Sequence, residues 1–252
     1  MMLSIDIGNT TIAIAVMNKM KVTSITRLDT NLSVHRLKAE LKNTLLSIAK
    51  KYKSINVAVV CSVVPNKTIV VAHEIHNVLN LKAKIIGQDI MVPMKNKYRN
   101  PKQVGQDRLV GAYAAMKLYG NPVIVIDLGT AITFDIVSPK KEYLGGVIVP
   151  GIRLSAESLF LKTALLPKIN IKAPKNVIGR TTEESILSGL FYGYGSLCQG
   201  LIELISKQMG GCPNVVMTGG HTHLMKRFVA SKIRIIDDNL VHKGMALLHL
   251  EC

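Results

Sequence analysis

The chain has 252 residues and a net charge of +16, and 48% of its residues are hydrophobic. This length allows one large domain or two smaller ones, with enough apolar side chains for aliphatic cores. No stretch is poor enough in apolar residues to predict disorder, and no apolar run approaches the roughly 18 residues of a membrane span. The composition therefore excludes a disordered chain and a protein with membrane-spanning helices.

The positive charge has two interpretations. It is typical of nucleic-acid-binding proteins, but it would also attract small anionic substrates such as ATP. The 32 Lys and Arg residues are scattered along the chain, with no run of five or more. A solvated, lysine-rich surface is therefore the preferred interpretation, and we do not expect nucleic acid as a partner.

The four cysteines indicate the compartment. Cys61, Cys198, Cys212 and Cys252 show no C-x-x-C spacing. The first strand is predicted to start almost at once, which leaves no room for a secretory signal. We therefore expect free thiols in a reducing cytoplasm and no membrane association.

The first half of the chain predicts a three-stranded meander followed by alternating helices and strands. Apolar residues from Val34 to Ile48 recur at helical spacing behind Ser33, a favourable N-cap residue. Residues 88–102 contain two prolines and predict a loop. The expected strands cover 3–8, 11–17, 20–28, 55–61 and 83–86, and the expected helices cover 34–51, 67–79 and 105–119.

The second half restarts the pattern after Asn121-Pro122. Its order predicts an α/β protein with mixed sheets, divided into residues 1–117 and 118–252. A linker with Pro167 and Pro174 is expected to precede a long helix. The expected elements after the second turn are a strand over 143–149, helices over 151–163 and 182–209, a strand over 215–217, a helix after 220, a strand over 233–236 and a final helix.

A strand-turn-strand segment occurs twice, at 4–14 and at 125–135. Each copy has a β-branched run ending in Asp, a Gly turn with Thr and a second β-branched run. Such a repeat predicts two halves of like architecture. Gly lets the backbone approach phosphates, turn N–H groups and Thr hydroxyls donate to them, and carboxylates can hold a cation. One copy would favour an ordinary hairpin, whereas two copies, with Asp6 and Asp127 in equivalent places, favour a nucleotide site.

A second candidate site lies at the predicted start of the helix over 105–119. There Asp107 and Arg108 stand side by side after Gly105 and Gln106. An Asp at this place is commonly a cap or a partner of the helix dipole. The functional alternative is a general base beside an anion-binding guanidinium, as phosphoryl transfer to an alcohol requires. Local sequence leaves both interpretations open.

Three further motifs contain glycine or threonine where a ligand or another strand could approach. Thr181 and Glu184 fit a capping box, which leaves a ligand role open for Thr182. The motifs are Gly145-Gly146 with Pro150-Gly151, Gly179-Arg180-Thr181-Thr182 and Thr218-Gly219-Gly220.

In this order, the motifs resemble those of type III pantothenate kinases, a family of the actin, sugar-kinase and heat-shock-chaperone ATPase superfamily. The resemblance runs nearly end to end, with Gln106 standing where the family often has a small residue. It implies two tandem actin-like (ribonuclease H-like) domains, each a mixed five-stranded sheet flanked by helices, with an ATP cleft between them. The motifs that carry it are Asp6-Ile7-Gly8-Asn9-Thr10, Tyr98 with Asn100-Pro101, Gly105-Gln106-Asp107-Arg108, Asp127-Leu128-Gly129-Thr130-Ala131, Gly145-Gly146 with Pro150-Gly151, Gly179-Arg180-Thr181-Thr182 and Thr218-Gly219-Gly220.

The resemblance also implies the role of each site residue. Asp107 would be the proton acceptor, and Asp127 would bind a monovalent cation, K⁺ or ammonium, while Mg²⁺ accompanies ATP. Thr182 would come from the neighbouring subunit of a homodimer whose pantothenate pocket lies at the interface, formed mostly by the second half. The expected ATP-binding residues are Asp6, Ile7, Gly8, Asn9, Thr10, Thr11, Ile12, Ala13 and Thr130. The expected pantothenate-binding residues are Tyr98, Gly105, Gln106, Asp107, Arg108 and Thr182.

The implied activity is ATP-dependent phosphorylation of pantothenate to 4′-phosphopantothenate, the first step of coenzyme A biosynthesis. The alternative is a non-catalytic regulatory or nucleic-acid-associated homologue that keeps the kinase fold. Retention of Asp6, Asp107, Asp127 and Thr182 favours the enzyme, because a non-catalytic homologue need not keep them.

Overall fold

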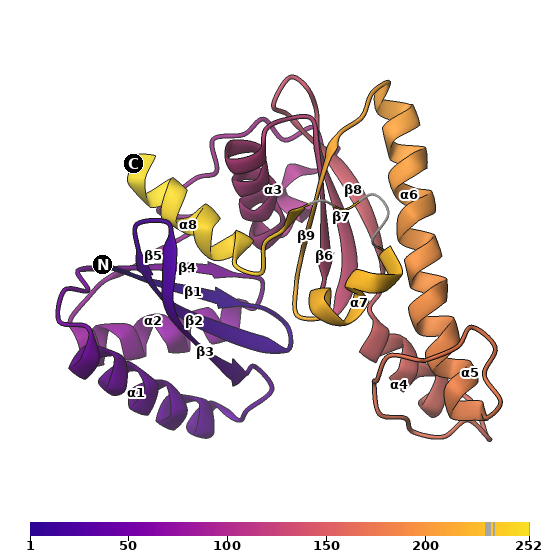
Figure 1. The fold of residues 1–252 in the computed structure, drawn as a ribbon. Coiled ribbons are helices and arrows are strands. Elements are labelled where there is room, and N and C mark those ends of the chain that lie inside the picture. Colours follow the sequence, from indigo (N-terminus) through magenta and orange to yellow (C-terminus); the bar gives the residue numbers. More distant parts are fainter. Residues whose placement is uncertain (230–232, 234, 252) are drawn as a thin grey trace. The chain divides into compact units, whose positions relative to one another are not determined.

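The computed structural model describes residues 1–229, 233 and 235–251. It divides into two compact units. The first contains Met1–Lys117 together with the stretch that begins at Asn239, and the second is Leu118–Asp238 (Figure 1). The last helix thus corrects the expected second half, 118–252, because it packs on the first sheet and not on the second.

The first unit is built on a five-stranded mixed sheet in the order β3-β2-β1-β4-β5. β1, β2 and β3 are antiparallel, and β4 and β5 run parallel to β1. The elements are β1 (Met2–Ile7), β2 (Thr11–Asn18), β3 (Lys21–Asp29), α1 (Val34–Lys51), β4 (Val57–Ser62), α2 (Pro65–Leu79), β5 (Ala83–Ile85), the short 3-10 helix η1 (Pro101–Gln103), α3 (Gln106–Tyr119) and α8 (Leu240–Glu251).

Alternation along the strands gives the first sheet two different faces. Leu3, Ile5 and Ile7 point to the side covered by α1 and α2, where they join a fully buried aliphatic core. As predicted, α1 begins after Ser33, whose side chain accepts a hydrogen bond from the backbone N–H of Arg36. Figure 1 shows α1 and α2 on one side of this sheet and α8 on the other.

The opposite face of β1 presents Met2, Ser4 and Asp6. Ser4 is fully buried, and its hydroxyl lies 2.8 Å from Nδ1 of His242 in α8. α8 in turn packs closely on α3, since a Cβ at Gly244 would lie 2.6 Å from a methyl carbon of Val110. The Ser4 side of this sheet is therefore covered by α8, which packs in turn on α3.

The buried His242 makes stability depend on pH. Burial, with a smaller contribution from Arg27, lowers the pKa of His242 to about 4. Because the unfolded value is near 6.5, the stabilisation is full above about pH 6.5 and is lost as the pH falls toward 4. We expect the wild-type unfolding free energy to fall by on the order of 3 kcal/mol over this range more than that of His242→Asn. Denaturant unfolding at several pH values measures this, and equal pH dependence in both proteins would contradict it.

The second unit repeats the architecture with the sheet order β10-β9-β6-β7-β8. β6, β7 and β8 are antiparallel, and β9 and β10 run parallel to β6. The elements are β6 (Val123–Leu128), β7 (Ala131–Val137), β8 (Tyr143–Pro150), α4 (Ile152–Lys162), α5 (Thr182–Ser188), the π-helical turn η2 (Gly189–Gly193), α6 (Tyr194–Met209), β9 (Asn214–Thr218), α7 (Thr222–Val229) and β10 (Ile235–Ile236).

The helices of this unit cover one face of its sheet. Ile124, Ile126 and Leu128 of β6 pack with α4 to α7 in a second aliphatic core, so alternation directs Asp127 to the other face. The helix expected over 182–209 is interrupted by η2, a change of hydrogen-bond spacing that the apolar pattern does not reveal. The strand expected over 233–236 includes residue 234, which lies outside the described residues.

The two units confirm the predicted repeat, with one difference in length. Asp6 pairs with Ala13 and Cys61, and Asp127 pairs with Thr133 and Thr218 at the equivalent positions. The second turn, however, is one residue shorter, because three residues separate the last strand pair there and four separate Ile7 from its partner Ile12 in the first. Direct alignment of the two segments is therefore correct only up to the glycine.

Candidate active site

The first turn connects β1 to β2 and exposes its polar residues. The backbone N–H of Gly8 donates to the carbonyl of Thr11 over 3.0 Å, and Asn9 and Thr10 are exposed. Thr30, which follows β3, stabilises the turn through two hydrogen bonds. Its N–H donates to the carbonyl of Thr10, and its hydroxyl donates to the carbonyl of Gly8. The result is a supported turn with exposed polar groups, suited to contact phosphate oxygens.

The second turn connects β6 to β7 and is fixed in the same way. The N–H of Gly151, after β8, donates to the carbonyl of Thr130 over 2.9 Å. A Cβ at Gly151 would collide with that carbonyl and would lie 2.5 Å from the oxygen of Gly129. Thr130 therefore corresponds to Thr10, and the glycine at 151 is needed because the backbone of the turn lies directly against it.

The first unit brings two predicted site carboxylates, Asp6 and Asp107, to the same buried group. Cys61 is fully buried on β4, beside Asp6 in the sheet. Burial raises the pKa of the Cys61 thiol well above its ordinary value, and the charges of Asp6 and Asp107 raise it further. The two carboxylates, which are distant in sequence, therefore both lie near the buried thiol of Cys61.

Asp107 occupies the first turn of α3 and is half-buried. Its Oδ1 accepts a hydrogen bond of 2.8 Å from the backbone N–H of Arg108. A Cβ at Gly105 would lie 2.5 Å from that oxygen and 3.3 Å from Val63, so the missing side chain makes room for the carboxylate. Burial raises the pKa of Asp107, and the N–H and charge of Arg108 oppose this effect. A carboxylate of raised basicity is suited to accept a proton.

Glycines also leave space for the side chain of Asp127. Gly219, in the turn after β9, has a φ of +99°, and a Cβ there would collide with Oδ1 of Asp127 and lie 2.6 Å from the nitrogen of Leu128. A Cβ at Gly129 would lie 3.3 Å from the same oxygen. Gly219, for which the sequence left a ligand or a packing role open, thus makes room for the Asp127 carboxylate.

The remaining predicted residues occupy three places in the fold. Tyr98 is half-buried in the loop before α3, where its N–H donates to the side chain of Asn96. Arg108 follows Asp107 and is also half-buried. Thr182 is the first, exposed residue of α5, and Thr181 caps that helix by accepting the N–H of Glu184, as predicted. The carboxylate of Glu184 accepts from Arg180.

Three residues that contribute to this geometry were not singled out from the sequence. Thr30 supports the first turn, Val63 lies against Gly105, and Gly87 lies against Gln106. Thr30 and Val63 directly follow β3 and β4, and Gly87 comes two residues after β5. Residues just after strands often lie at the ligand edge in α/β proteins, and this position was the available signal.

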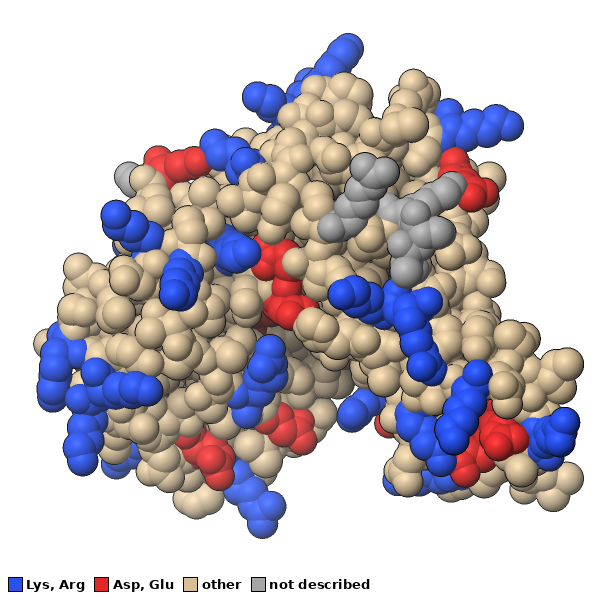
Figure 2. Space-filling view, in the orientation of Figure 1, with Lys and Arg blue, Asp and Glu red and all other residues tan. Residues whose placement is uncertain are grey.

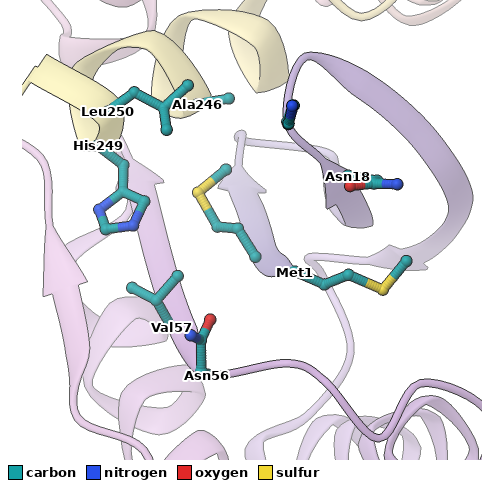
Figure 3. Close-up of a pocket in the computed structure, with 9 residues that line it drawn as sticks. Met1, Asn18, Asn56, Val57, Ala246, His249 and Leu250 are labelled. Carbon is teal, nitrogen blue, oxygen red and sulfur yellow. The ribbon is translucent and has the colours of Figure 1, made fainter.

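A pocket of ≈190 Å³ opens at the other end of the first sheet, by the start of β1 and the end of α8 (Figure 3). None of the predicted site residues lines it. Figure 3 shows the His249 ring directed into this space. Its lining residues are Met1, Met2, Asn18, Lys19, Asn56, Val57, Ala246, His249 and Leu250.

Solved structures of other proteins share the fold of this chain. A Baf family protein from Campylobacter jejuni has a TM-score of 0.60 at 19% identity, covering 99% of this chain and 98% of its own. The activator of 2-hydroxyisocaproyl-CoA dehydratase from Clostridium difficile, solved with bound ADPNP, has a TM-score of 0.53 at 13% identity, covering 99% and 94%. The doubled sheet order and these likenesses confirm the predicted actin-like fold of two tandem domains.

Sequence comparison identifies the family. The family model for type III pantothenate kinase matches residues 2–204, and the chain belongs to that family. A type III pantothenate kinase from Persephonella marina is 42% identical over 229 residues, 90% of each chain. One from Finegoldia magna is 36% identical over 255 residues, 98% of this chain and 96% of its own.

Membership confirms the predicted enzyme class. The chain is a phosphotransferase that uses ATP and has an alcohol group, that of pantothenate, as acceptor, in coenzyme A biosynthesis. The non-catalytic alternative is accordingly not favoured.

Proposed function

We propose that this chain transfers the terminal phosphoryl group of ATP to pantothenate with Asp107 as the general base. The observation that carries this proposal is the half-buried Asp107 carboxylate, held over Gly105 and, like Asp6, near Cys61. The proton of the primary hydroxyl passes to Asp107 while the hydroxyl oxygen bonds to the γ-phosphorus and the bond to the ADP oxygen breaks. The other five predicted residues of the pantothenate site form its pocket: Tyr98, Gly105, Gln106, Arg108 and Thr182.

The nucleotide contacts follow from the two supported turns. The first turn, with the N–H groups and hydroxyls of residues 6–13, holds phosphate oxygens, and Thr130 of the second turn adds a contact. In the first turn, the exposure of Asn9 and Thr10 and the hydrogen bonds from Thr30 support this assignment. Preorganised donors of this kind stabilise the charge of the transferring group without reorganisation.

The carboxylates fit the cations that the family implies. Asp127 offers hard oxygen donors in a space kept open by Gly129 and Gly219, so it is suited to K⁺ or ammonium. Asp6, beside the first turn, is suited to Mg²⁺ that accompanies ATP, directly or through water. Cations at these places would supply positive charge beside the phosphates, while the protein's own contribution is to hold the two carboxylates in place.

We further propose a homodimer in which Thr182 contacts the pantothenate of the partner subunit. The second unit exposes many apolar side chains on β8, on α4 and in the segments that lead to α5, which supports an interface there. These exposed residues are Leu144, Ile148, Leu154, Phe160, Leu161, Leu165, Val177 and Ile178.

A single charge on this surface is expected to separate the subunits. Leu161 on α4 is 72% exposed, and Leu161→Asp should convert the dimer to a monomer and raise the KM for pantothenate, because each site would lose the partner's Thr182. Light scattering with size-exclusion chromatography measures the mass. Ile69→Asp is the matched control, since Ile69 on α2 is 71% exposed. A dimeric Leu161→Asp protein, or a monomeric wild type, would contradict the proposal.

The distribution of charge on the surface bears on the partners of the enzyme. Figure 2 shows Lys and Arg spread over the visible face, without one dominant basic patch, which favours general attraction of anionic substrates over a nucleic-acid interface. Among the described residues, no helix is both long and apolar enough to cross a bilayer. We propose that the enzyme acts in the cytoplasm.

The proposal is tested by a coupled assay with ATP, Mg²⁺ and pantothenate, run in potassium and then in sodium buffer. We expect phosphopantothenate and ADP in equal amounts, with much higher turnover in potassium. Other alcohols serve as negative controls for the acceptor. Absence of phosphopantothenate in potassium buffer would overturn the proposed reaction, and equal turnover in both buffers would overturn the cation role of Asp127.

A further inference from the structure

The side chain of Gln106 lies on Gly87. This contact connects the start of α3 with the turn that follows β5. A Cβ at Gly87 would lie 2.7 Å from Cδ of Gln106 and 3.0 Å from both its Nε2 and its Oε1. The whole carboxamide therefore covers the Cα of Gly87. The residue also has a φ of +83°, which side chains rarely adopt. The positive φ therefore favours glycine at position 87, and a Cβ there would require the end of the Gln106 side chain to move.

The turn that contains Gly87 is attached firmly to the first sheet. Ile86 donates its N–H to Val60 of β4 over 2.9 Å, and Gly87 donates to Ile90 over 2.8 Å. Ile86 and Ile90 pair with each other and are 3% and 2% exposed. The carboxamide of Gln106 therefore rests on a backbone segment that is held by hydrogen bonds and by burial of its flanking side chains.

The residue that follows Gln106 is Asp107. Gln106 is the first residue of α3, so its placement fixes the direction in which the first helical turn begins. The Asp107 carboxylate has little freedom of its own, because Oδ1 accepts the N–H of Arg108 and lies against Gly105. A shift of the backbone at Gln106 would therefore carry the Asp107 carboxylate with it.

We propose that Gly87 and Gln106 are positioning residues for the general base. The carboxamide of Gln106, packed on the Gly87 turn, sets the first turn of α3 and thereby the place of the Asp107 carboxylate. This inference rests on the proposed role of Asp107. It gives the Gln106 side chain a task other than the substrate contact predicted for that position, where the backbone remains available to pantothenate.

A double-mutant cycle of Gly87→Ala and Gln106→Ala tests the inference. Gly87→Ala should lower kcat roughly 10- to 100-fold, because the new methyl group displaces Gln106 and a shift of about 1 Å has effects of that size. The KM for ATP should stay unchanged. Gln106→Ala alone should lower kcat only a few-fold, and the double variant should regain most of the activity lost in Gly87→Ala, since the methyl group then finds free space.

Two further readouts separate positioning from general destabilisation. The acid limb of the pH profile of kcat/KM should move to lower pH in Gly87→Ala, because a displaced Asp107 loses the burial that raises its pKa. Gly120→Ala is the matched control: its φ is +84°, and its nearest neighbour would be Nδ2 of Asn214 at 3.6 Å. This control carries the same backbone strain without a collision, and its kcat should equal that of the wild type.

The inference is overturned if Gly87→Ala keeps the wild-type kcat, or if the folded double variant is no more active than Gly87→Ala. Should Gly87→Ala fail to fold while Gly120→Ala folds, the double variant decides: a folded, active double variant supports the pair, and an unfolded one contradicts it. Full activity in Asp107→Asn would instead exclude Asp107 as the general base. Thermal unfolding of the single and double variants would still report the Gly87–Gln106 contact. The two failures are thus distinguishable.

Discussion

Replacement of Asp107 by asparagine is expected to lower kcat by roughly 10²–10⁴-fold, the range for loss of a general base. The amide keeps the size of the carboxylate and can still accept the N–H of Arg108 through its oxygen, so the first turn of α3 should be preserved. It cannot accept the proton of the pantothenate hydroxyl. Steady-state kinetics with ATP and pantothenate in potassium buffer measures the effect.

ATP binding provides the control for this variant. The dissociation constant for ATP should be unchanged in Asp107→Asn, because the proposed phosphate contacts come from the first turn and Thr130. Normal affinity with low kcat assigns the loss to the chemical step. Turnover equal to that of the wild type would show that another group accepts the proton.

Alanine at Gly219 is expected to damage both stability and the cation response. The residue is in the left-handed region, and a Cβ would collide with the Asp127 carboxylate and the backbone of Leu128. We expect a loss of about 2–4 kcal/mol of unfolding free energy, the sum of backbone strain and overpacking. The displaced carboxylate should also remove most of the stimulation by K⁺.

The next residue supplies the matched control. A Cβ at Gly220 would meet no atom within 4 Å, so Gly220→Ala should keep nearly the wild-type stability and K⁺ dependence. Denaturant unfolding and a K⁺ titration of turnover measure both quantities in the two variants. Equal behaviour of the two alanine variants would show that Gly219 does not make room for Asp127.

Local signals predicted most of the fold. The alternating β-branched runs gave the meanders, and Ser33 and Thr181 were recognised as caps because their side chains satisfy the first free N–H groups of a helix. The observed α2 begins at Pro65, slightly before the expected start, since proline is well suited to the first helical turn. Such features depend on neighbouring residues alone, and for that reason sequence reasoning reached them.

Features that depend on distant residues were missed. The return of α8 to the first unit is fixed by the contact of Gly244 with Val110 and by the pair of His242 and Ser4, residues far apart in the chain. The shorter second turn emerges only from strand register, and the π-helical η2 from its hydrogen bonds. No periodicity of apolar residues encodes these relations.

The site residues show the same difference between features set by neighbouring residues and features set by distant ones. Asp6, Asp107 and Asp127 could be proposed as site residues because their motifs stand at strand ends and at a helix start. The space beside Asp107 and Asp127 was not predicted, since it is left by glycines whose partners are set by the fold, as with Gly219 and Asp127. The sequence shows where the glycines stand, and the structure shows which side chain occupies the space beside each of them.

The proposed role of Asp107 is tested most directly by a crystal structure with pantothenate and a non-hydrolysable ATP analogue. A carboxylate oxygen of Asp107 should lie about 2.6–3.2 Å from the primary hydroxyl oxygen of pantothenate, or be joined to it by one water. A hydroxyl beyond that reach, with no bridging water, would contradict the role of Asp107 as the group that accepts its proton.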